Sequence, residues 1–163
     1  MPDKGSASVA WTALSPECKF SSGSYADGRW RIWDWAAAAS AVTLVSVWHV
    51  DFTSDSKTVG VSDGTSIVLH DLASGERLRQ FSLNGLGSSR APGALEIDPS
   101  GQRLALFNTE AGTNVLILDL RTGPTRATLQ HASFAWHLAW HPAGRGQAIG
   151  CGGKTIHRWE PLR

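Results

Sequence analysis

Short hydrophobic segments alternate along this chain with turns that are rich in Gly, Pro, Ser and Asp. One order of elements occurs four times: a strand with small residues, a turn, a short strand, a second turn, and an apolar strand that ends on an acid. The four copies read VAWTALSPECKFSSGSYADGRWRIWDW, VWHVDFTSDSKTVGVSDGTSIVLHDL, ALEIDPSGQRLALFNTEAGTNVLILDL and WHLAWHPAGRGQAIGCGGKTIHRWEP. Short strands bounded by such turns predict antiparallel meanders and not β-α-β units.

The acids that end the four copies recur at a nearly constant interval. They are Asp34, Asp71, Asp119 and Glu160, which follow one another at 37, 48 and 41 residues. A period of roughly 40–45 residues is that of a four-stranded propeller blade. The chain is therefore predicted to be all-β, with four repeating units.

The turn and strand-end residues carry a family resemblance. Ser15-Pro16, Asp98-Pro99 and His141-Pro142 lie between the first two strands of their copies, and Trp33-Asp34 ends the third strand of the first copy. These residues resemble the turn and the Trp-Asp dipeptide of the WD-repeat family. The resemblance implies a WD-repeat β-propeller of about four blades, each a four-stranded antiparallel meander, with the last blade incomplete. It is closest to bacterial WD-repeat arrays appended to signalling proteins such as Ser/Thr kinases, although no kinase motif occurs here.

The resemblance also implies a structural role for several side chains. WD repeats join a His, a Ser or Thr, an Asp and a Trp by hydrogen bonds, and the matching residues here are Trp33, Asp34, Asp71, Asp119, Trp159, Asp27, Asp63 and His131. No copy has the complete set, because Gly5 and Thr43 replace histidines and Gly152 and Gly153 replace the Asp of the last copy. Each missing hydrogen bond is expected to cost stability on the order of 1 kcal/mol.

We expect one domain with blades at about 7–46, 47–92, 93–134 and 135–163. The expected strands are 8–14, 19–24, 30–35 and 42–45; 47–52, 58–61, 67–71 and 78–83; 94–97, 103–107, 115–118 and 125–129; and 137–140, 147–150 and 155–159. The last blade lacks a fourth strand, so both ends of the array are expected to be open. The array is then a piece of a longer propeller, which we favour, or half of a ring closed by two copies, or a four-bladed ring that closes alone.

Composition narrows the possible partners. The chain has 15 basic and 14 acidic residues, and this balance provides no electrostatic footprint for nucleic acid or an anionic membrane. It shows no signal peptide and no apolar run of about 18 residues, so we expect no membrane insertion and a cytoplasmic location. Cys18 and Cys151 match neither a disulfide framework nor a metal-ligand spacing, and no cofactor or metal is expected.

Aromatic residues indicate a binding surface. In WD propellers the residue at the bulge that opens the innermost strand is a frequent partner contact, and counting back from the turns places Trp48 and Trp136 there. Phe134 and Ser46 stand two residues earlier. Exposed aromatics are typical anchors of protein interfaces, so these four residues are candidates for partner binding. The alternative is that the tryptophans pack between blades.

Acidic residues form a second candidate site. Asp51 and Glu96 occupy equivalent positions on the innermost strands of blades two and three, and His49 and His137 lie nearby in the repeat pattern. They could form a metal or acid–base site, or simply line the channel as solvated groups. Because no catalytic motif is present, we predict a non-catalytic scaffold for protein–protein interaction that can self-associate through its open end blades. The alternatives are a small propeller enzyme using these groups and an architectural subunit that completes a ring.

Overall fold

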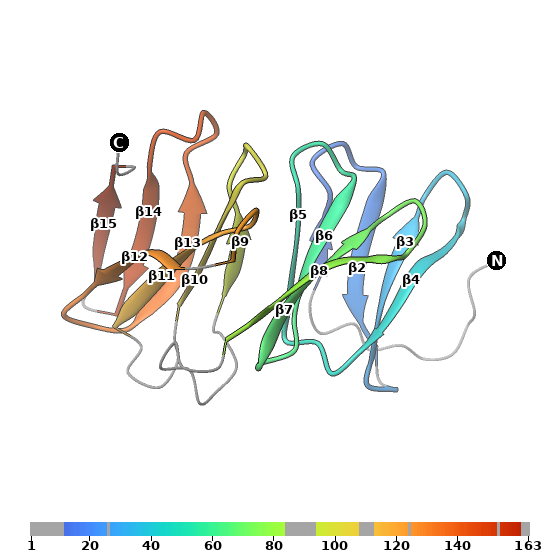
Figure 1. The fold of residues 1–163 in the computed structure, drawn as a ribbon, viewed down its shortest axis with the longest axis horizontal. Helices are drawn as coiled ribbons and strands as arrows, with labels where there is room; N and C mark the ends of the chain where they lie inside the picture. The colour runs from blue at the N-terminus through green and yellow to red at the C-terminus, as the bar shows by residue number, and fades with distance from the viewer. Residues whose placement is uncertain are drawn as a thin grey trace.

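The fold consists of four antiparallel sheets that follow one another along the chain (Figure 1). This computed structural model describes residues 12–160 except 26, 84–93, 108–112, 124 and 153. The first sheet contains β1 (Thr12–Leu14), β2 (Phe20–Ser24), β3 (Arg29–Asp34) and β4 (Ala39–Val45), and the second contains β5 (His49–Phe52), β6 (Thr58–Ser62), β7 (Ser66–Asp71) and β8 (Arg77–Ser82). The third contains β9 (Leu95–Ile97), β10 (Arg103–Phe107), β11 (Asn114–Asp119) and β12 (Thr125–Gln130), and the fourth contains β13 (Ala135–Trp140), β14 (Gln147–Cys151) and β15 (Thr155–Trp159).

The sheets are arranged as the four blades of a propeller. Within each sheet the strands pair in chain order, and the innermost strands β1, β5, β9 and β13 contact one another in sequence. This confirms the predicted all-β fold with a three-stranded last blade. In Figure 1 the first and fourth blades lie at opposite ends of the long axis. No helix occurs in the described ranges, so none there is long and apolar enough to cross a membrane.

The turn between the first two strands has the same geometry in every blade. Its first residue is Ser15, Thr53, Asp98 or His141, and the backbone N–H of that residue donates to the carbonyl five residues later at 2.8–2.9 Å. The N–H three residues later donates back to its carbonyl at 2.7–2.9 Å. In each case the first side chain accepts a backbone N–H within the turn, as Ser15 Oγ does from Phe20 at 3.0 Å. Such side-chain acceptors explain why these residue types recur at this position.

The four turns are also joined to one another. Glu17 N–H donates to Ser56 Oγ at 3.3 Å, and Ser54 Oγ donates to the carbonyl of Pro99 at 2.6 Å. Arg103 Nη2 donates to the carbonyl of Gly144 at 3.3 Å. A line of polar contacts therefore connects each blade to the next at this end of the molecule.

The recurring acids at the end of the third strand are explained by the turn that follows. The Oδ1 atoms of Asp34, Asp71 and Asp119 each accept the backbone N–H groups two and three residues later at 2.8–3.0 Å. This is an Asx turn, and it reverses the chain into the outermost strand. Ala38, Gly75 and Gly123 complete these turns with positive φ. Glu160, the fourth acid, is instead exposed and pairs with Arg158 at 3.3 Å.

Hydrophobic side chains fill the spaces between neighbouring blades. On β10, Leu104 and Leu106 pack toward blade two, while Ala105 and Phe107 pack toward blade four. Both faces of this strand are buried, which is why it reads as a continuous apolar run. A third cluster around Ile32 and Val59 joins blades one and two.

The predicted strand positions agree with the structure in most places. All fifteen expected strands are present, and β4 begins at Ala39, three residues earlier than expected, because the turn ends at Ala38. The expected first strand, 8–14, is described only from Thr12, and its earlier part lies outside the described residues.

Candidate functional site

Three aromatic side chains predicted to bind a partner lie at the molecular surface. The exposed fractions are 58% for Trp48, 62% for Trp136 and 54% for Phe134, and Ser46 is exposed as well. The indoles of Trp48 and Trp136 are therefore not buried between blades. Trp48 directly precedes β5, and Phe134 and Trp136 lie at the start of β13. Both strands begin at the lower edge of the molecule in Figure 1. Partner binding itself stays a prediction.

Trp136 occupies a bulge, as the sequence predicted. Ala135 pairs with Cys151 and His137 with Gly150, so Trp136 is the extra residue between them. A bulge directs such a side chain away from the regular strand faces. The Trp136 indole lies across Gly152, where an added Cβ would stand 2.9 Å from Nε1. Phe134 completes this corner, with its ring centroid 6.5 Å from that of Trp136.

Trp48 belongs to the connection between blades one and two. Its backbone N–H donates to the carbonyl of Ser62 at 2.8 Å, which fixes it just before β5. Ser46, in the connection that leads to Trp48, has a positive φ of 55°. Val45, the last residue of β4, directly precedes this connection and is 67% exposed. Val45 was not among the predicted contact residues; it ends β4, the outermost strand of blade one. Blade three separates this group from Trp136, so the aromatic surface has two parts.

Asp51 and Glu96 are brought close together on β5 and β9. Asp51 Oδ2 accepts the N–H of Ile97 at 2.6 Å, and its Oδ1 accepts the N–H of Phe52 at 2.9 Å. Burial raises the pKa of Asp51 to about 6 against these two hydrogen bonds. Burial and then the charge of Asp51 raise the pKa of Glu96 to about 7. The two carboxyl groups thus share one partly buried place at the contact between blades two and three.

The two histidines do not complete a metal-binding group with these acids. Burial lowers the pKa of His49, and His137 is exposed on β13 opposite Gly150. Among the residues that the structure describes, one group of three or more His, Cys, Asp or Glu side chains is close enough to share an ion, and it contains none of these four residues.

The repeat residues make local contacts rather than the hydrogen-bond chain of a complete WD repeat. Trp33 Nε1 donates to the Tyr25 hydroxyl at 2.6 Å, and Asp27 pairs with Arg31 at 2.5 Å. Asp63 holds its own hairpin turn by accepting the N–H groups of Thr65 and Ser66 at 2.8 and 2.6 Å.

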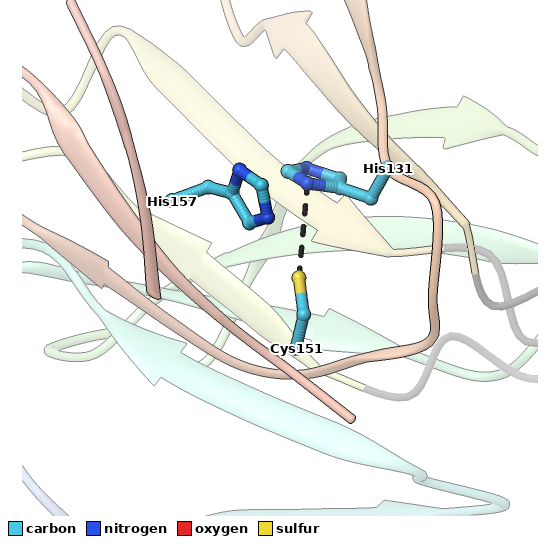
Figure 2. A group of neighbouring side chains, drawn as sticks. All are labelled: His131, Cys151 and His157. Atoms are coloured by element: carbon cyan, nitrogen blue, oxygen red, sulfur yellow. Dashed lines mark hydrogen bonds between the residues drawn. The ribbon is translucent and has the colours of Figure 1, made fainter. Parts of the chain in front are cut away.

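A group that the sequence analysis did not identify lies between blades three and four. His131, Cys151 and His157 place one ligand atom each within 4.8 Å of one another, and their side chains converge in Figure 2. His131 Nδ1 lies 3.7 Å from Cys151 Sγ. In the sequence only His131 stood out, by its place in the repeat. The pairing of β14 with β15 sets Cys151 opposite Thr155, two residues from His157.

No protein-family model and no curated protein sequence matches this chain. The propeller architecture therefore rests on the structure itself. It defines a class of rigid β-scaffolds that carry either binding or catalytic sites.

Proposed function

We propose that this chain is a non-catalytic scaffold for protein–protein interaction, built as a WD-repeat array. The observation that carries the proposal is the exposure of Trp136, Phe134 and Trp48 where the innermost strands begin. Large aromatic rings on a rigid backbone are the side chains that most often dominate binding energy at protein interfaces. The repeat resemblance supports a role as an interaction module of a bacterial signalling protein, in a reducing compartment where neither cysteine forms a disulfide.

The bound partner is a polypeptide that offers apolar side chains to the Phe134–Trp136 corner. This corner is the stronger anchor because its two rings are adjacent and the indole of Trp136 packs closely against Gly152. Trp48 and Val45 form the second contact. An occupant that reaches both must cross the end of blade three, so an extended segment or a second domain fits better than a small molecule.

The test is selection of binding peptides from a displayed random library, followed by affinity measurement with purified variants. Trp136→Ala and Phe134→Ala should each weaken binding by about 2 kcal/mol or more, which is roughly 30-fold. Trp35→Ala is the matched control, since Trp35 is 63% exposed but lies in the β3–β4 turn. The indole N–H signals of Trp48 and Trp136 should shift on binding.

If Trp35→Ala weakened peptide binding as much as Trp136→Ala does, the proposal would be contradicted, because exposed aromatic residues would then bind peptides wherever they lie. Peptides that bind tightly without shifting the indole N–H signal of Trp136 would also contradict the proposal. Loss of the circular dichroism spectrum in Trp136→Ala would show that this residue supports the fold rather than binding.

A further inference from the structure

We propose that His131, Cys151 and His157 form a binding site for a transition-metal ion that prefers thiolate and imidazole ligands, with Zn²⁺ as the expected ion. The three side chains come from three segments. His131 follows β12, Cys151 ends β14 and His157 lies in the middle of β15. Figure 2 shows the two imidazole rings and the thiol turned toward one common point.

The hairpin register explains why the fold brings these groups together. Cys151 pairs with Thr155 and Ile149 pairs with His157, so Cys151 and His157 lie on the same face of the fourth blade. This face packs against Phe107, Val115 and Ile117 of blade three. His131 reaches it from the connection between the two blades, where its backbone N–H donates to the carbonyl of Thr113 at 2.7 Å.

The spacing of the donor atoms fits tetrahedral zinc. Zn–S and Zn–N bonds of about 2.3 and 2.0–2.1 Å place sulfur and nitrogen ligands roughly 3.5 Å apart. The observed separation between Cys151 Sγ and His131 Nδ1 is 3.7 Å. The remaining pairs lie within 4.8 Å, and His157 is exposed, so its ring can rotate inward without disturbing the core.

The choice of metal follows from the donor types. Two imidazoles and one thiolate suit zinc, whereas magnesium and calcium take oxygen ligands. Three protein ligands leave a fourth position for water or for a ligand from a partner. Thr155 Oγ1 lies 3.4 Å from His157 Nε2, a contact of the kind that orients metal-binding imidazoles.

His131 also differs from the structural histidines of the chain. His70 Nδ1 lies 3.3 Å from the carbonyl of Gly75, and His141 Nδ1 accepts the N–H of Ala143 at 3.0 Å. His131 is buried, and its Nδ1 contacts the Cys151 sulfur. Its Nε2 has no hydrogen-bond partner in the described part of the chain, so no oxygen or N–H group there fixes the tautomer of this ring, and Nδ1 is available to bind an ion beside the sulfur.

The bound ion would join blade four to the connection from blade three. Because the site forms only in the folded chain, metal binding stabilises the fold by linkage. The open last blade has only three described strands, and this added link would hold it in place.

The test uses the full chain purified without a polyhistidine tag, stripped with a chelator and titrated with Zn²⁺ by calorimetry. One ion should bind per chain and raise Tm by several degrees. His157→Gln should weaken binding by at least about tenfold, while His137→Gln, the same change at another exposed histidine of blade four, should leave it unchanged. Cobalt(II) should give a thiolate charge-transfer band that is lost in Cys151→Ser and kept in Cys18→Ser.

The proposal is overturned if Zn²⁺ does not bind the wild-type chain, or if His157→Gln binds it as tightly as His137→Gln does. A cobalt band that persists in folded Cys151→Ser would also overturn it. Should Cys151→Ser not fold, the exposed His157→Gln decides the question alone, because its circular dichroism spectrum is expected to match that of the wild-type chain.

Discussion

At the scale of single residues, the molecule uses polar side chains mainly to shape its own backbone. Ser15, Thr53 and His141 accept N–H groups in their turns, and Asp71 does so after a third strand. Asp51 is different because it accepts the N–H of Ile97 from the neighbouring blade. It therefore connects the ionisation of one carboxyl group to the contact between blades two and three.

The first prediction concerns the pH dependence of stability. The pKa values of Asp51 and Glu96 rise from 3.8 and 4.5 to about 6 and about 7 on folding. The folded chain then holds more protons than the unfolded chain across this range, so its stability falls as the pH rises. The free energy of unfolding should be higher near about pH 5 than near about pH 8, by on the order of 1–3 kcal/mol.

Denaturant titrations at several pH values provide the measurement. Glu96→Gln should flatten the profile, and Asp51→Asn should in addition lower the pKa of Glu96, since the charge of Asp51 contributes to its rise. A wild-type stability that increases steadily from acid to neutral pH would show that other carboxyl groups dominate.

At the scale of elements, the sequence predicted nearly the whole set of strands because each strand end is marked by local chemistry. Ser15-Pro16 and Trp33-Asp34 identify turns that depend on only a few neighbouring residues. The bulge at Trp136 was also predictable from its distance to the turn, whereas its exposure was one of two alternatives that the sequence left open. The group at His131 was not, because its members are neighbours only through the pairing of β14 with β15 and the packing between blades.

The second prediction concerns the turn between β9 and β10. Asp98 is fully buried, pairs with Arg103 at 2.9 Å, and accepts the N–H groups of Gln102 and Arg103 at 2.9 and 2.8 Å. Burial alone would raise its pKa, but hydrogen bonds from Ser100 and Arg103 outweigh it and hold the pKa below its usual value. Asp98→Ala should cost about 3 kcal/mol of unfolding free energy, since it removes the ion-pair partner of Arg103 and leaves two N–H groups without their acceptor.

Chemical denaturation of Asp98→Ala beside His141→Ala checks this expectation. His141 holds the equivalent place in blade four but is exposed and accepts one N–H group, so its loss should cost about 1 kcal/mol or less. Similar losses in both variants would mean that the buried ion pair contributes nothing beyond an ordinary turn.

At the scale of the whole molecule, three apolar layers hold four blades in a row, and the two ends of the row differ from its middle. Blades two and three are covered on both faces, whereas blades one and four each have one described neighbour. Within the described residues β15 pairs only with β14, and its Ile156 is 80% exposed. Exposed strand edges with apolar side chains pair readily with other chains.

The last prediction is that the chain self-associates through blade four. Among the described strands β15 pairs on one side only, so its other edge offers backbone N–H and carbonyl groups to a second copy, and the exposed Ile156 adds apolar surface to that contact. Light scattering and sedimentation over a dilution series should show the apparent mass rising with concentration.

Ile156→Lys should shift the chain toward the monomer, because a lysine on an edge strand opposes pairing. Leu78→Lys places the same change on β8, the edge strand of a blade that has all four strands, and should leave association unaltered. A chain that stays monomeric at every concentration and unfolds in one cooperative step would show that the β15 edge needs no partner strand. There would then be no reason to expect a second copy or further blades at this end.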